Sequence, residues 1–307
     1  MVSQKRMDRR TALKLLGLGF LGATATVSGV QLYTHSKTAE RNYDFQSVEK
    51  GPTIFDQVAA DNGFIFAHII GGNSPNHLSR AKEMKKTIEG IATKRPITYA
   101  LETDLCWAND NGKLLFYGFH PSVSQYFNPL SIREIVQKER AGEILLVEDM
   151  LADSDGMAIC FDIKSGPGDR TKALEELLEM SKGRQAWFET YDTKILQEIN
   201  GIDPQAASSI KIIHYQGDNK ALLFPYVNRY WPVVDLTRIP TDSVVNFFAP
   251  EVDSDLTKLE RDVARMGKHL FFGPVLGDKN ALRLSYQHGR GAFIREDQFT
   301  DMMEVLS

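Results

Sequence analysis

Charged side chains follow two mostly apolar runs of the sequence, about sixty residues apart. Glu102 and Asp104 end the first run, and Asp162 and Lys164 end the second. Successive side chains of a strand alternate between its two faces, so the two members of each pair share a face. An apolar run that ends in charges is typical of a buried strand whose C-terminal end carries polar chemistry.

Three carboxylates and one ammonium group at the ends of two core strands predict a site for a metal ion and an anion. Mg²⁺ and Ca²⁺ bind carboxylate oxygens together with the oxygens of a substrate phosphate. We therefore expect Glu102, Asp104 and Asp162 to hold one divalent cation, Mg²⁺ or Ca²⁺, as the cofactor. Lys164 adds a positive charge that can neutralise phosphate.

Two histidines lie near these runs in the sequence. His68 comes close to the end of a third apolar run and is followed by Gly71 and Gly72, which open a loop. His120 follows a turn signal at 109–112 and a short expected strand. A histidine at a strand end, with carboxylates downstream, is a candidate for proton transfer because imidazole titrates near neutral pH.

The order of these residues resembles the glycerophosphodiester phosphodiesterase superfamily, the phospholipase-C-like (β/α)8 barrels. In that family a histidine ends strand one, Glu-x-Asp ends strand two, a second histidine follows a small hairpin, and an acidic-x-Lys pair ends strand three. The resemblance covers residues 63–166 and is topological afterwards. It implies a phosphodiesterase in which His68 and His120 act as general base and acid, in an order that the sequence does not assign, and Lys164 assists.

The chain also departs from the family pattern. Ile69 stands where the family usually has arginine, and Asp162 where it usually has glutamate. The apolar Ile69 and the string 161–166 are closer to the sphingomyelinase D and phospholipase D branch, whose C-terminal signature is missing. Aromatic residues in 221–239 would also suit a lipid.

Three functions therefore stay open. The first is cleavage of glycerophosphodiesters to glycerol 3-phosphate and an alcohol. The second is removal of the headgroup from a lysophospholipid or sphingolipid, and the third is an inactive barrel that binds phosphate-bearing ligands. The expected partner is accordingly a small-molecule or lipid phosphodiester. Residues that could line the mouth of the site are Trp187, Glu189, Tyr226, Tyr230 and Trp231.

Composition and element spacing predict a single α/β domain. The formal net charge of −4 gives no basic surface for nucleic acid, so no nucleic-acid partner is expected. Strands and helices alternate along 56–307, a length that suits one (β/α)8 TIM barrel of ~250 residues. The strands are expected at 63–70, 97–104, 157–164, 185–190, 210–215, 244–248, 270–275 and 291–294. Cys106 and Cys160 are expected as free thiols, because their different heights on neighbouring strands keep the sulfur atoms apart.

The first residues predict export. Arg9 and Arg10 precede a Leu-Lys pair and an apolar stretch at 15–30, a pattern typical of a twin-arginine signal peptide over 1–30. The stretch is short and weakly hydrophobic for a bilayer span. We expect a periplasmic or secreted protein that uses the twin-arginine translocase, with a lead-in at 31–55. An uncleaved N-terminal anchor and a peripheral membrane contact are the alternatives left open.

Overall fold

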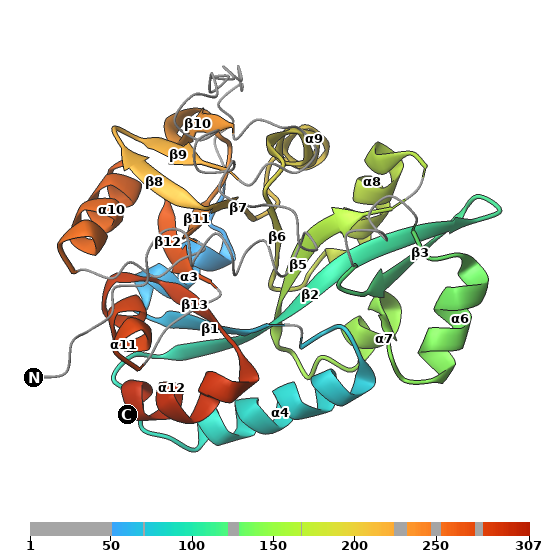
Figure 1. Cartoon of the computed structure of the whole chain (residues 1–307), viewed down its shortest axis with the longest axis horizontal. Helices are drawn as coiled ribbons and strands as arrows, with labels where there is room; N and C mark the ends of the chain where they lie inside the picture. Colours follow the sequence, from blue (N-terminus) through green and yellow to red (C-terminus); the bar gives the residue numbers. More distant parts are fainter. Residues whose placement is uncertain are drawn as a thin grey trace, which may run out of the picture.

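Eight parallel strands form a closed barrel in the computed structural model, which describes residues 51–69, 71–121, 129–166, 168–223, 232–246, 253–273 and 279–307 (Figure 1). The first strand pairs with the second on one side and with the last on the other, which closes the sheet. In barrel order the strands are β1 (Phe64–His68), β2 (Ile97–Asp110), β5 (Ala158–Ser165), β6 (Ala186–Thr190), β7 (Ser208–Ile212), β11 (Ser243–Asn246), β12 (His269–Phe272) and β13 (Gly291–Ile294). The expected (β/α)8 TIM barrel is the fold of this chain.

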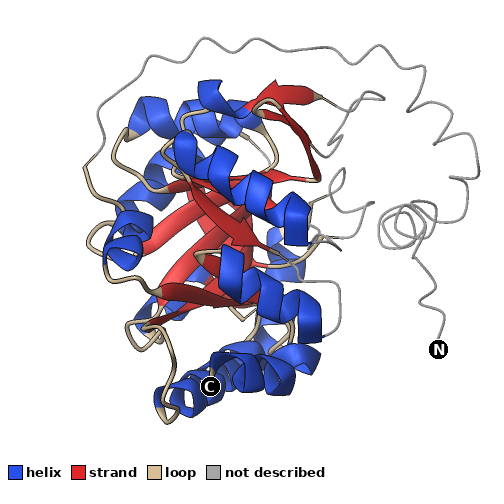
Figure 2. Ribbon diagram, turned by 90° about the vertical axis from the view of Figure 1, so that its left-hand side faces the viewer, coloured by secondary structure: helices blue, strands red, loops and turns tan. Residues whose placement is uncertain are grey.

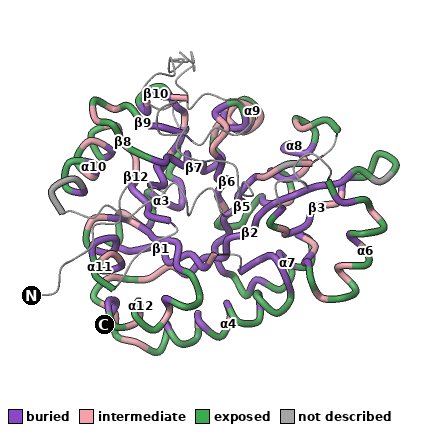
Figure 3. The backbone as a smooth tube through the Cα atoms, in the orientation of Figure 1, coloured by how far each residue is buried: buried purple, intermediate pink, exposed green. Residues whose placement is uncertain are grey.

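Helices cover the outside of the barrel, as Figure 2 shows. They are α4 (Pro75–Glu89), α6 (Ile132–Arg140), α7 (Val147–Ala152), α8 (Arg170–Ser181), α9 (Thr193–Ile202), α10 (Asp253–Arg265), α11 (Lys279–His288) and α12 (Phe299–Leu306). The barrel strands are mostly buried, and much of the exposed surface lies on the outer faces of the helices (Figure 3). Phe64 and Phe66 of β1 belong to the core between strands and helices, whereas Ile65 and Ala67 belong to the interior of the barrel.

The N-terminal end of the barrel is closed by a short helix, α3 (Ile54–Ala60). Phe55 on this helix packs edge-on against Trp187 and Phe271 of the interior, with ring centroids 5.6 and 5.5 Å apart. His269 at the start of β12 lies 2.9 Å from Asp56 of the same helix. The mouth at the C-terminal end is therefore the face left for a site. This helix begins within the last residues of the expected lead-in and was not predicted.

Two additional groups of strands extend from the C-terminal end of the barrel. The second strand continues past the barrel and forms a hairpin with β3 (Lys113–Gly118), which in turn pairs with β4 (Leu145–Leu146). Asn111 and Gly112 at its tip both have positive φ, the geometry of a type I′ turn. After β7 the chain forms an antiparallel sheet of β8 (His214–Gly217), β9 (Lys220–Leu222) and β10 (Val233–Asp235). Two 3₁₀ turns, η1 (Leu236–Arg238) and η2 (Glu296–Gln298), complete the described elements.

Some boundaries differ from those expected. The strand expected to end at 104 runs to Asp110, because hairpin pairing continues its ladder. The helix expected to run to 94 ends at Glu89, where Gly90 caps it. The strand expected over 210–215 divides into β7 and β8, which belong to different sheets.

Within the described ranges, the structure contains no helix that is both long enough and apolar enough to cross a bilayer. The expected signal at 1–30 and most of the lead-in lie outside the described residues.

Candidate active site

The three predicted carboxylates converge inside the mouth of the barrel. Glu102 and Asp104 point inward from β2, and Asp162 lies opposite Asp104 on the neighbouring strand β5. One oxygen of each residue lies within 4.8 Å of those of the other two, and all three residues are buried. A single divalent cation could contact all three oxygens at this spacing. The structure therefore brings the three predicted ligands together, and their binding of a metal ion stays a prediction.

The electrostatics of this group fit a cation. Burial, reinforced by the negative charge of Asp104, raises the pKa of Glu102 to about 8. Burial also acts to raise the pKa of Asp162, but the ammonium groups of Lys164 and Lys211 lower that pKa to about 2. Lys211 and Lys164 act in the opposite direction on Glu102 but do not outweigh its burial, and a bound Mg²⁺ or Ca²⁺ would further favour its ionised form.

Asn73, in the loop after β1, fixes the position of Asp104. Its Nδ2 donates to Asp104 Oδ2 at 2.7 Å, and its Oδ1 accepts from the Asp104 backbone N–H at 2.9 Å. The Thr103 hydroxyl donates to the same Oδ1 at 3.1 Å. The Gly72 N–H donates to the Glu102 carbonyl at 3.0 Å, which fastens the loop to β2. The sequence prediction missed Asn73, because its partners lie about thirty residues further along the chain.

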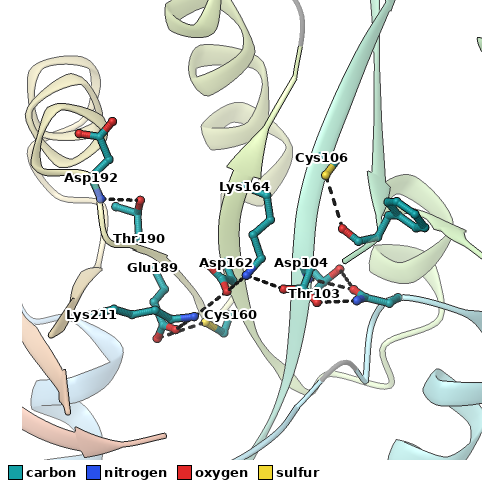
Figure 4. Close-up of polar contacts among 12 residues, drawn as sticks. Thr103, Asp104, Cys106, Cys160, Asp162, Lys164, Glu189, Thr190, Asp192 and Lys211 are labelled. Carbon is teal, nitrogen blue, oxygen red and sulfur yellow. Dashed lines mark hydrogen bonds and ion pairs between the residues drawn. The ribbon is translucent and has the colours of Figure 1, made fainter. Parts of the chain in front are cut away.

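Two lysines reach the carboxylates (Figure 4). Lys164 Nζ lies 2.7 Å from Asp104 Oδ1 and also pairs with Asp162. Lys211 Nζ, from β7, lies 2.5 Å from Asp162 Oδ2 and 2.6 Å from Glu189 Oε1. Lys164 thus lies beside the predicted carboxylates, and its catalytic role stays a prediction. Lys211 was missed, although its alternation with Ile210 and Ile212 in an apolar strand was a readable signal for an inward-facing lysine.

His68 lies at the end of β1, directly beside β2, and is 4% exposed. Its Nδ1 is 3.3 Å from the carbonyl oxygen of Ile294, on the other neighbouring strand. Burial lowers the pKa of His68, and the charged groups that act on it are Glu296, His77 and Arg80. The described contacts of this ring therefore lead away from the carboxylates, and its catalytic role stays a prediction.

His120 is exposed and follows the end of β3. The N–H of the preceding residue, Phe119, donates to the Asp104 carbonyl at 2.8 Å. This bond holds the backbone before His120 against β2 at the level of Asp104. The structure thus places His120 at the rim of the site, and its part in catalysis stays a prediction.

The remaining predicted residues have mixed outcomes. Trp187 lies in the aromatic interior below the mouth, where it packs on Phe55, whereas Glu189 belongs to the charged layer. Tyr226, Tyr230 and Trp231 lie outside the described residues. Cys106 and Cys160 are buried free thiols, as expected.

No family model and no curated protein matches the chain. A glycerophosphodiester phosphodiesterase from Parabacteroides distasonis is 13% identical, with 80% of this chain and 97% of that chain covered and a TM-score of 0.52. A phosphodiesterase from Oleispira antarctica, solved with the product sn-glycerol-3-phosphate, is 14% identical, with 79% and 96% covered and a TM-score of 0.53. A putative glycerophosphodiester phosphodiesterase from Galdieria sulphuraria is 11% identical, with 80% and 97% covered and a TM-score of 0.53.

These similarities define the chain as a barrel with the glycerophosphodiester phosphodiesterase fold. They extend over nearly the whole length of those proteins. At such identities they establish the fold, and the chemistry must be argued from the site itself.

Proposed function

We propose that the protein is a metal-dependent phosphodiesterase that cleaves glycerophosphodiesters to glycerol 3-phosphate and an alcohol. The observation that carries the proposal is the buried group of Glu102, Asp104 and Asp162, whose oxygens lie within 4.8 Å of one another in the mouth of the barrel. The mouth is the end at which TIM-barrel enzymes place their active sites. The solved structures with the same fold include a phosphodiesterase with sn-glycerol-3-phosphate as its product, which supports the same substrate class here.

Each residue of the site has a defined task in this proposal. Glu102, Asp104 and Asp162 would hold Mg²⁺ or Ca²⁺, which would supply Lewis-acid polarisation of the substrate phosphate. Lys164, already 2.7 Å from Asp104, supplies positive charge where negative charge grows on the phosphate. Asn73 keeps Asp104 in the orientation that the cation requires.

The two histidines are proposed to move the protons. Because burial lowers the pKa of His68, its imidazole is neutral at pH 7 and can accept a proton. Its participation requires the ring to leave the carbonyl oxygen of Ile294 and turn toward the phosphate. His120, at the exposed rim, can exchange protons with an alcohol that leaves toward solvent.

One observation favours the lipid alternative. Ile69 is half-buried and packs against the apolar interior of the barrel, so one wall of the mouth is apolar beside the charged layer. Such a wall suits the chain of a lysophospholipid or sphingolipid whose headgroup is removed.

The proposal also retains export through the twin-arginine translocase, based on Arg9 and Arg10.

Product analysis tests the function. The mature protein is incubated with glycerophosphocholine or lysophosphatidylcholine, together with Mg²⁺, Ca²⁺ or EDTA. Glycerol 3-phosphate from the first substrate supports the proposal, and choline from the second supports the lipid alternative. No turnover of either substrate with any metal, combined with tight phosphate binding, would leave the inactive phosphate-binding barrel as the function. Asp104→Asn is the control for activity that does not come from the site.

A further inference from the structure

Lys211 is a buried cation whose ammonium group lies between two carboxylates. Its Nζ is 2.5 Å from Asp162 Oδ2 and 2.6 Å from Glu189 Oε1, and its side chain is 7% exposed. The same atom lies 5.4 Å from the centre of the Tyr191 ring. Figure 4 shows Lys211 and Glu189 on one side of Asp162 and Lys164 on the other. The charged layer therefore extends from β2 across β5 and β6 to β7.

A structural role alone is a weak explanation for this pair. Replacing a buried ion pair by apolar residues of similar volume is often neutral or stabilising, because both charges must be removed from water. On β6 the interior below the charged layer is apolar: Trp187, two residues before Glu189 on the same strand face, packs against Phe55 and Phe271. The change from apolar to charged side chains occurs at the level of the proposed metal ligands. The pair thus belongs to the mouth rather than to the core.

The two lysines share an acceptor. Asp162 Oδ2 pairs with both Lys164 and Lys211. An oxygen atom placed next to this carboxylate can therefore accept hydrogen bonds from both ammonium groups. Non-bridging phosphate oxygens are strong acceptors for such donors. Glu189 gives Lys211 a partner of its own, which holds the ammonium group in place when Asp162 binds a cation.

The net charge of the layer favours the binding of a divalent cation first and of an anionic substrate afterwards. Four carboxylates stand against two ammonium groups, which leaves two negative charges when all of them are ionised, and one divalent cation balances these. A phosphodiester can then enter a neutral site. Without Lys211 the same site would stay negative after metal binding and would repel the phosphate.

We propose that Lys211, positioned by Glu189, is a second phosphate-binding cation that acts beside Lys164 on the anionic oxygens of the substrate. The inference rests on the proposed function, because it assumes a ligand that carries phosphate. It assigns the specificity of the mouth for an anionic phosphodiester to two lysines from different strands.

The proposal predicts opposite effects on two ligands. Lys211 attracts a phosphate but repels a metal ion, so Lys211→Met should weaken binding of sn-glycerol 3-phosphate to the Mg²⁺-loaded protein by about ten- to a hundredfold. The same variant should bind Mg²⁺ several-fold more tightly, because Asp162 and Glu189 lose a competing cation. A lysine with only a structural role would leave both affinities unchanged or weaken both. Lys211→Arg should keep most of the phosphate affinity.

A second variant covers the case in which Lys211→Met does not fold. Lys211→Met with Glu189→Gln removes the pair together and leaves no buried unpaired carboxylate. Its net charge equals that of the wild type, so its Mg²⁺ affinity should be close to normal while its phosphate affinity stays low. Lys86→Met, on the exposed surface of α4, is the matched control and should change neither affinity.

Isothermal titration calorimetry with Mg²⁺ and with sn-glycerol 3-phosphate measures both affinities without turnover. Wild-type phosphate affinity in Lys211→Met, or in the double variant, would overturn the inference and leave the proposed function standing. A wild-type protein that binds Mg²⁺ but not sn-glycerol 3-phosphate would overturn both. Weaker phosphate binding in both variants supports the assignment, provided that Mg²⁺ binds more tightly to Lys211→Met and with nearly normal affinity to the double variant.

Discussion

Asp104 and Asp162 occupy facing positions on neighbouring parallel strands, and the ammonium group of Lys164 binds both carboxylates. This lysine balances the repulsion between two buried negative charges. Glu102 lies two residues before Asp104 on β2, deeper in the barrel. Its pKa is raised because burial and the charge of Asp104 both disfavour its ionised form. The three carboxylates are therefore unequal, and the next two predictions follow from that difference.

Metal affinity should depend on pH through Glu102. The pKa of Glu102 is about 8, so a proton competes with the cation for this carboxylate below that pH. The affinity for Mg²⁺ or Ca²⁺ should therefore rise by up to tenfold per pH unit as the pH increases toward 8. Glu102→Gln should bind more weakly and lose most of this dependence. Calorimetric titration at pH 6, 7 and 8 measures it. A wild-type affinity that does not change over this range would contradict the raised pKa.

Loss of Asp104 should remove activity at every pH. Asp104→Asn keeps the shape of the side chain but removes a ligand charge, so metal affinity and turnover should both fall by at least about a hundredfold. Asn73→Ala removes only the hydrogen bonds that orient Asp104 and should weaken metal affinity by about ten- to a hundredfold. Full turnover in excess chelator would refute the metal requirement itself.

The histidine prediction separates an enzyme from an inactive barrel. General acid–base catalysis contributes ~10²–10⁴-fold, so His68→Ala and His120→Ala should each lower kcat by at least about a hundredfold. The double variant should lose far less than the product of the single losses, because the two groups serve one proton-transfer sequence. A diester with a very acidic leaving group needs no protonation and should rescue the variant that has lost the general acid. Wild-type rates in both His68→Ala and His120→Ala would contradict the assignment of these histidines as general acid and base.

Stability should depend on an arginine at the opposite end of the barrel. The Arg95 guanidinium donates to the carbonyl oxygens of Asn62, Gly63, Tyr286 and Gly289, and lies 5.3 and 5.2 Å from the ring centres of Phe64 and Tyr286. Arg95→Met should lower the free energy of unfolding by about 2–4 kcal/mol, through the lost charged hydrogen bonds and stacking. Metal affinity of the folded fraction should not change. Thermal and urea unfolding measure the loss, with the exposed Lys94→Met as the control.

Export should require the two arginines near the N-terminus. Replacing Arg9 and Arg10 by lysine should leave the precursor in the cytoplasm, because the twin-arginine pair is what the translocase reads. Fractionation of cells that express either form measures this. Normal export of the double variant would refute the twin-arginine signal.

The carboxylate group could be predicted because its logic is local: Glu-x-Asp and Asp-x-Lys place both members of each pair on one strand face. The neighbours of Lys211 indicate that its side chain faces inward, but they do not indicate its pairing with Asp162 and Glu189, because these partners come from two other strands. The same alternation also places His68 with Phe64 and Phe66, on the strand face away from the barrel interior. The short helix α7 carries Val147, Met150 and Leu151 at helical spacing, but six residues are too few for this period to distinguish a helix from a loop.

The closed floor of the barrel also decides how the molecule can be mounted on a surface. Gly51 binds Gln205 just before β7, and the carbonyl of Leu306 accepts from the N–H of Lys94 just before β2. Both ends of the described chain thus lie at the floor, away from the carboxylates. A biosensor chip or affinity resin coupled through the C-terminal residue would hold the protein with its mouth facing the solution, open to a substrate that arrives from the bulk.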